Sequence, residues 1–122
     1  MPKKILIVDD ADTILLMEKV ILSKGSYKVV TAKDGEEAIK KAGLEKPDLI
    51  LLDVMMPKMN GFDTCKYLRT RADMENTPII LVTTRGEAEN MEKGYESGCT
   101  DYITKPINGA ELLSKVKNYL GE

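Results

Sequence analysis

Polar side chains suited to phosphate chemistry follow four short apolar runs of the chain. With the residues that follow them, the runs read KILIVDD, LILLD, IILVT and YITKP, and each has the composition of a buried strand. At or just past their carboxyl ends stand Asp9, Asp10, Asp53, Thr83 and Lys105. Because open α/β sheets bind ligands in the crevice beyond the carboxyl ends of their strands, we expect these side chains to converge.

The three aspartates predict a site for a hard divalent cation. Carboxylates this close together repel one another unless a cation lies between them. Mg²⁺ suits a site made only of oxygens, and Mn²⁺ is a credible substitute. Asp53 is then the candidate nucleophile, since a carboxylate can attack phosphorus to give an acyl phosphate. The competing interpretation is that Asp9, Asp10 and Asp12 only cap a helix and line a solvated loop.

Thr83 and Lys105 are the candidate contacts for phosphoryl oxygens. The hydroxyl is a hydrogen-bond donor, and the ammonium is a point charge that suits phosphate. Neither residue is informative alone, because Thr is at home in strands and a Lys at a strand end is usually solvated. Pro106 follows Lys105 and is a candidate cis-proline that would direct the lysine inward, although few X-Pro bonds are cis.

Composition and length limit the class of protein. The 122 residues predict one domain, 1–122, with a sizeable core. The net charge of −2 gives no basic excess for nucleic-acid binding, and the absence of His excludes a Ser-His-Asp triad and a histidine phosphocarrier role. Cys65 and Cys99 fit no metal spacing. The apolar runs are too short to cross a bilayer and MPKK leads into a strand, so we expect a cytoplasmic protein.

Apolar runs alternate with amphipathic stretches along the whole chain, which predicts five βα units and a parallel sheet. Strands are expected at 4–8, 28–32, 49–52, 79–82 and 102–104. Helices are expected at 12–24, at a short stretch stopped near Gly43, from Gly61 onward, at about 87–97 and at 110–120. Right-handed crossovers favour a doubly wound three-layer sandwich, while the pattern leaves the strand order open.

The spacing of apolar residues also predicts which face of each helix packs on the sheet. Asp12 is expected to cap the first helix. The residues expected to face inward recur three or four apart: Ile14, Met17 and Ile21; Ala38, Ile39 and Ala42; Phe62, Cys65 and Leu68; Ala88, Met91 and Tyr95; Leu113, Val116 and Leu120.

In this order and at this spacing, the motifs resemble the receiver domain of two-component response regulators. The matching parts are IVDDAD, LILLDVMMPKMNGFD, PIILVTT and GCTDYITKP, and the resemblance covers essentially the whole chain. It implies a flavodoxin-like (βα)5 fold of the α/β class, with a five-stranded parallel sheet of order 2-1-3-4-5. It also implies a phosphorylation-activated signalling switch of bacterial type, and no enzyme beyond self-catalysed phosphorylation and dephosphorylation.

The resemblance assigns roles at the metal and acceptor positions. Asp53 would accept a phosphoryl group from a partner histidine kinase or histidine phosphotransfer protein. Asp9 and Asp10 would organise Mg²⁺, with Asp10 and Asp53 as side-chain ligands and the carbonyl of Met55 as a backbone ligand.

The resemblance also assigns the residues that sense the phosphoryl group. Thr83 and Lys105 would bind it, and Tyr102 matches the aromatic switch residue, which turns inward as Thr83 moves. Thr84 is larger than the residue often found at its position. We hypothesise that the side chains of Met55 and Arg85 shield the acyl phosphate and slow its hydrolysis.

The face from Glu87 to Leu120 would be the output surface for a downstream protein. Its charged residues could pair across a two-fold interface, or form a solvated helical face. A monomer and a phosphorylation-dependent dimer therefore both remain open. The charges concerned are Glu89, Glu92, Lys93, Glu111 and Lys115.

Other functions fit the residues less well. A flavin-binding electron carrier would have to place a phosphate against the carboxylates of IVDDADT, and a phosphohydrolase would want a general acid where Met55 stands. A phosphorylation-independent binding module is disfavoured because the acceptor set is complete. MPKK and YLGE favour a stand-alone regulator over the receiver fragment of a longer DNA-binding response regulator. We expect no membrane partner and no direct nucleic-acid partner.

Overall fold

The computed structural model describes residues 2–84 and 88–121, without the side chains of 84 and 88–91. Five strands alternate with five α-helices and one short 3₁₀ helix in this part of the chain. The strands are β1 (Lys3–Val8), β2 (Tyr27–Ala32), β3 (Leu49–Asp53), β4 (Ile79–Thr84) and β5 (Asp101–Lys105). The helices are α1 (Asp12–Leu22), α2 (Gly35–Glu45), α3 (Gly61–Arg69), η1 (Ala72–Met74), α4 (Ala88–Glu96) and α5 (Gly109–Leu120).

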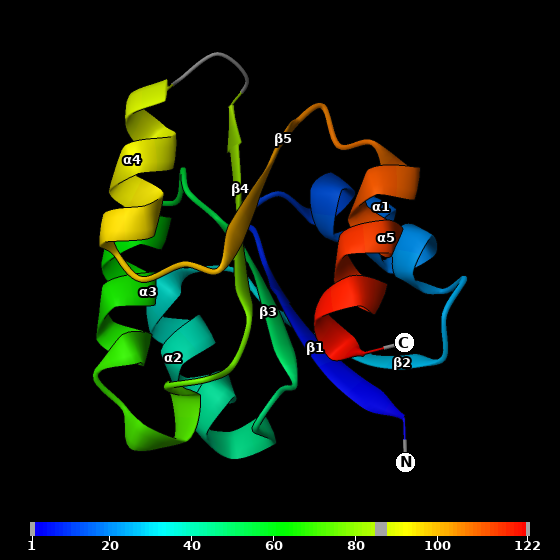
Figure 1. Cartoon of the computed structure of the whole chain (residues 1–122), viewed down its shortest axis with the longest axis horizontal. Helices are drawn as coiled ribbons and strands as arrows, with labels where there is room; N and C mark the ends of the chain where they lie inside the picture. The colour runs from blue at the N-terminus through cyan, green and yellow to red at the C-terminus, as the bar shows by residue number, and fades with distance from the viewer. Residues whose placement is uncertain (1, 85–87, 122) are drawn as a thin grey trace.

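All five strands are parallel and lie in the order β2-β1-β3-β4-β5. Helices α1 and α5 cover one face of the sheet, and α2, α3 and α4 cover the other (Figure 1). This confirms the expected doubly wound three-layer sandwich and its strand order. Parallel strands buried on both faces explain why the central runs are almost continuously apolar.

Alternation along the strands divides the core into two layers. One layer packs beneath α1 and α5, and the other packs beneath α2, α3 and α4. From β1, β3 and β4, the first layer takes Ile5, Ile7, Leu49, Leu51, Ile80 and Val82. The second takes Leu6, Val8, Ile50, Leu52, Ile79 and Leu81. This interlocking of side chains fixes the strand register and, with it, the level at which each strand ends.

The first helix differs from its predicted form. Its N-cap is Ala11 rather than Asp12, since Ala11 is extended and its carbonyl accepts the first hydrogen bonds of the helix. The backbone N–H of Ala11 donates to the Asp9 carboxylate at 2.9 Å. The buried face is rotated by one residue and runs through Leu15, Glu18 and Leu22. The predicted stripe of Ile14, Met17 and Ile21 lies half-buried at the edge of that face.

Three other details were wrong for related reasons. Helix α2 passes through Gly43 and ends at Glu45, where Lys46 adopts a left-handed backbone conformation and ends the helix. On α5 the fully buried residues are Leu112 and Val116, with the predicted Leu113 and Leu120 half-buried. Tyr95 was expected to face the sheet, yet it is 52% exposed because it packs sideways against Tyr102 at the edge of the sheet.

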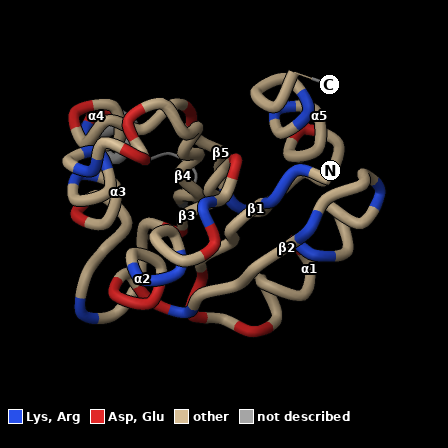
Figure 2. The backbone as a smooth tube through the Cα atoms, turned by 90° about the horizontal axis from the view of Figure 1, so that it is seen from below, with Lys and Arg blue, Asp and Glu red and all other residues tan. Residues whose placement is uncertain are grey.

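Charged residues of both signs lie along the backbone of α2, α3 and α4, while most of the strand backbone carries neither (Figure 2). In the part of the chain that is described, no helix has both the length and the apolarity needed to cross a bilayer.

Candidate phosphoryl-acceptor site

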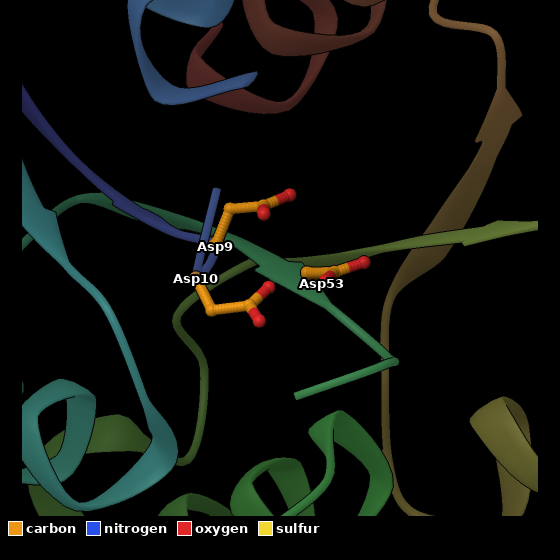
Figure 3. Close-up of side chains that lie close together, drawn as sticks. All are labelled: Asp9, Asp10 and Asp53. Atoms are coloured by element: carbon orange, nitrogen blue, oxygen red, sulfur yellow. The ribbon is translucent and has the colours of Figure 1, made fainter. Parts of the chain in front are cut away.

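The carboxyl edge of the sheet gathers three aspartates. Asp9 and Asp10 follow β1, and Asp53 ends the adjacent β3. Each offers a carboxylate oxygen, and these oxygens all lie within 4.8 Å of one another. In Figure 3 the three side chains project the same way, past the ends of their strands. Asp9 and Asp53 are 1% and 3% exposed, whereas Asp10 is exposed to solvent.

The oxygens of Asp9 have different surroundings. Oδ1 accepts the hydrogen bond from the N–H of Ala11, which holds the carboxylate at the start of α1. Oδ2 is buried and forms no hydrogen bond within the described part of the chain, although the Lys105 ammonium lies 3.5 Å away. A buried carboxylate oxygen that is only partly compensated is costly, and a hard cation is a ligand that would complete its surroundings. The cluster therefore fits the predicted metal site better than it fits a helix cap and a solvated loop.

Lys105 reaches the same cluster from β5. Its Nζ lies 3.1 Å from Oδ1 of Asp53 and 3.5 Å from Oδ2 of Asp9. Burial alone would lower the pKa of the lysine, but its contacts with Asp53 and Asp9 outweigh burial and raise the pKa. The Lys105–Pro106 bond is cis, as the sequence suggested. The ammonium is thus held charged beside the candidate acceptor.

The acceptor carboxylate itself is electrostatically unfavourable. Burial, followed by repulsion from Asp9, raises the pKa of Asp53 to about 6, although Lys105 opposes the change. A bound cation could relieve only the part of this shift that comes from repulsion between carboxylates, because the part that comes from burial would remain. A perturbed pKa beside a specific charge partner makes Asp53 a candidate site residue.

The remaining predicted residues lie at or below this edge. Thr83 is buried on β4, at 3% exposure, and is paired in register with Thr104. Met55 follows β3 with its side chain 68% exposed. Tyr102 lies two residues deeper in β5, half-buried, with its ring edge-on to Tyr95 at 6.1 Å between centroids. Their assigned roles in metal binding and switching stay predictions.

Helix α3 approaches the acceptor strand so closely that only glycine fits at its first position. A Cβ on Gly61 would lie 2.8 Å from Cα of Val54 and would collide with the carbonyl oxygen of Asp53. Backbone atoms on both sides leave no flexible group that could move aside.

Gly61→Ala is accordingly expected to destabilise the protein by about 2 kcal/mol or more and to displace the acceptor strand from α3. Urea unfolding measures the first effect, and cation binding by the purified protein measures the second. Gly109→Ala is the matched control, because Gly109 also opens a helix and a Cβ there would meet the Ile21 side chain at an ordinary contact distance of 3.4 Å. Equal stability of Gly61→Ala and the parent protein would contradict the close contact.

Two acidic residues were not predicted to matter here: Glu18 and Asp101. Glu18 is 2% exposed on the inner face of α1. Its spacing, three residues after Leu15 and four before Leu22, could have indicated that it shares their buried face. Asp101 forms an ion pair with Lys115 at 3.1 Å and accepts a hydrogen bond from Tyr119 at 2.7 Å. Lys115, expected to be available to a second copy of the chain, is therefore engaged within its own chain.

Several predictions fall on residues that the structure does not describe. Arg85 and Glu87 lie outside the described ranges, as do the side chains of Thr84, Glu89 and Met91. The hypotheses of phosphoryl shielding and of charge pairing through Glu89 remain predictions.

Comparison with known proteins gives one consistent answer. The family model for the response regulator receiver domain matches residues 5–117. The alkaline phosphatase synthesis transcriptional regulatory protein PhoP of Bacillus subtilis is 47% identical over 98% of this chain. That alignment covers 49% of PhoP, so the chain spans about half the length of this curated relative.

Solved structures agree in fold. The chemotaxis response regulator CheY4 of Vibrio cholerae superposes with a TM-score of 0.91 at 36% identity, covering 98% of this chain and 99% of CheY4. The receiver domain of the sensor histidine kinase PA1611 from Pseudomonas aeruginosa, solved with magnesium in its active-site cleft, gives 0.91 at 26% identity over the full length of both chains. The chain belongs to the family of response regulator receiver domains.

Proposed function

We propose that the chain is a phosphorylation-activated switch that accepts a phosphoryl group on Asp53. The observation that carries the proposal is the lysine ammonium 3.1 Å from a buried, electrostatically strained carboxylate. In the transfer, a carboxylate oxygen of Asp53 forms the new bond to phosphorus. The bond from phosphorus to the donor breaks, and the donor, an imidazole nitrogen of a histidine kinase or histidine phosphotransfer protein, leaves with the bonding electron pair.

The surrounding residues have separate proposed roles. Asp9, Asp10, Asp53 and the backbone carbonyl of Met55 would hold Mg²⁺, as the magnesium in the cleft of the PA1611 receiver domain supports. Mg²⁺, when bound, neutralises charge on the carboxylates and on the arriving phosphoryl oxygens. Lys105 keeps a permanent positive charge at the acceptor and pairs with the oxygens of the transferred group.

The switch would pass from the acceptor to the α4–β5–α5 surface. Thr83 would contact the transferred group and leave space that Tyr102 could enter, which would break the edge-on contact between Tyr102 and Tyr95. Two populations of one surface, biased by phosphorylation, are sufficient for signalling. Because Lys115 is already paired with Asp101 in its own chain, we favour a different protein over a second copy of this chain as the partner at this surface.

The direct test is incubation of the full chain with acetyl phosphate and Mg²⁺, followed by intact mass. We expect an adduct of about 80 Da, one phosphoryl group, that is absent without Mg²⁺ and absent from Asp53→Asn. Asp63→Asn, which removes an exposed carboxylate on α3, is the matched control and should keep the adduct. No adduct on the parent protein, or one that survives Asp53→Asn, would reject the proposed function.

A further inference from the structure

Glu18 is a buried acid that the proposed phosphoryl transfer does not use. It lies on α1 between Leu15 and Leu22, which belong to the apolar layer between α1, α5 and the sheet. The residue is 2% exposed, and its Oε1 has no hydrogen-bond partner. Placing an ionised carboxylate in such surroundings is expensive, so the group must carry a proton or find a positive charge.

The site lies in the direction in which this side chain leans. Side chains on a helix tilt towards its N-terminus, and α1 begins at the carboxyl edge of the sheet, beside Asp9 and Asp10. Glu18 is not one of the carboxylates whose oxygens meet there, so it is no candidate metal ligand. It is a separate acid in the layer beneath the site.

Among the described residues, the charged groups that act on Glu18 belong to that site. Burial, then repulsion from Asp9 and from Asp53, raises the pKa of Glu18 to about 8, and Lys105 partly opposes the shift. The fully buried residues that α5 packs beside α1 are apolar. Burial is the largest cause and does not depend on the aspartates, so a cation at the site would reduce the shift without abolishing its main source.

Building on the proposed function, we infer that Glu18 is a positioning residue whose protonated form permits Asp53 to accept the phosphoryl group and whose ionised form opposes it. Ionised Glu18 adds a third negative charge to those of Asp9 and Asp53, which pair with Lys105. It also adds negative charge beneath a site that must receive the anionic phosphoryl group. Protonated Glu18 does neither, so the transfer is linked to the retention of one buried proton.

The test compares the full-length parent protein with Glu18→Gln, which copies the neutral acid at all pH values. Each is incubated with acetyl phosphate and Mg²⁺ between pH 6.5 and 9, and intact mass gives the initial rate of phosphorylation. A group with a pKa of about 8 changes from mostly protonated to mostly ionised between pH 7 and 9. We expect the rate of the parent protein relative to Glu18→Gln to fall at least about tenfold over that interval, because a cation that lowers the pKa of Glu18 makes the fall larger.

Dividing the two rates removes the pH dependence of the donor and of Asp53, which both proteins share. Glu36→Gln, an exposed acid at the start of α2, is the matched control and should follow the parent protein. A ratio of parent to Glu18→Gln that stays within twofold from pH 7 to 9 would overturn the inference.

A second measurement needs neither donor nor metal. Glu18 binds its proton more tightly in the folded than in the unfolded chain, so its contribution to stability is complete below pH 4.5 and is lost as the pH rises through 8. Urea unfolding of the parent protein should show this loss, and Glu18→Gln and Glu18→Leu should not. If no protein takes up a phosphoryl group, the proposed function fails, and parallel stability profiles of parent and Glu18→Gln would separately show that Glu18 holds no proton.

Discussion

Asp53→Asn is expected to make the metal-free protein more stable at pH 7, raising its free energy of unfolding by up to about 3 kcal/mol. Asp53 is buried, and Asp9 repels it, so its pKa is raised from 3.8 to about 6. The folded chain therefore binds the proton more tightly than the unfolded chain. The stability that this proton contributes is complete below pH 3.8 and is lost as the pH rises through 6.

The difference between Asp53→Asn and the parent protein should accordingly be near zero at pH 3.5 and reach its maximum above pH 7. Loss of the contact between Lys105 and Asp53 reduces the gain, which is why 3 kcal/mol is an upper value. Urea unfolding at a series of pH values measures the difference. Asp63→Asn, at an exposed position on α3, is the control for the loss of a carboxylate. If the difference in free energy of unfolding stayed constant between pH 3.5 and 7, the raised pKa of Asp53 would be contradicted.

Added Mg²⁺ should narrow the difference in stability between Asp53→Asn and the parent protein. At ten times its dissociation constant, a ligand bound only by the folded state adds about 1.4 kcal/mol. The parent protein is expected to gain this amount and to lose it again when the cation is chelated. Asp53→Asn, with one fewer carboxylate in the cluster, should gain much less. If both proteins gained equal stability from Mg²⁺, the cation would bind at a site that does not include Asp53.

Arg69→Ala is expected to lower the free energy of unfolding by about 2–4 kcal/mol. The guanidinium at the end of α3 donates to the carbonyls of Met74, Thr77 and Gly98 at 2.6, 2.8 and 2.8 Å. It also donates to the hydroxyl of Thr100 at 3.2 Å. Removing it leaves four acceptors without this donor and frees α3 from the segment that leads into β5.

Arg71→Ala supplies the control, because Arg71 makes a local ion pair with Asp73, two residues away, at 3.0 Å. Exposed pairs of this kind contribute at most about 1 kcal/mol. Arg69→Lys should recover little of the loss, since an ammonium cannot reproduce the planar fork of donors. Chemical denaturation of the three variants gives the comparison. If Arg69→Ala and Arg71→Ala were equally stable, the hydrogen bonds of the Arg69 guanidinium would make no net contribution to the free energy of unfolding.

Much of the site could be predicted from short-range pattern. Each polar site residue follows an apolar run directly in the sequence. The alternation of apolar runs with amphipathic stretches indicates parallel strands, whose carboxyl ends lie at one edge of the sheet. That reasoning placed Asp9, Asp10, Asp53 and Lys105 together before any distance was known, and the structure confirms it.

The errors about which helix face is buried share one physical origin. Which face of a helix is buried depends on the neighbouring helix and on the tilt of the helix over the sheet, and not only on its own apolar residues. On α1 the rule favoured Ile14 and Met17, whereas packing beside α5 buried Leu15 and Leu22. The same rotation carried Glu18 into the core. Tyr95 is exposed for a similar reason, because its partner Tyr102 lies at the sheet edge.

The fold class, the polar residues at the strand ends and the chemistry of those residue types follow from residue order alone. Periodicity and residue type are local properties, so they can be read without any long-range contact. The charge environment does not follow from residue order, because burial and the distances between carboxylates depend on residues far apart in the chain. The strained Asp53, the ammonium held against it and the protonated Glu18 beneath it arise from the tertiary structure.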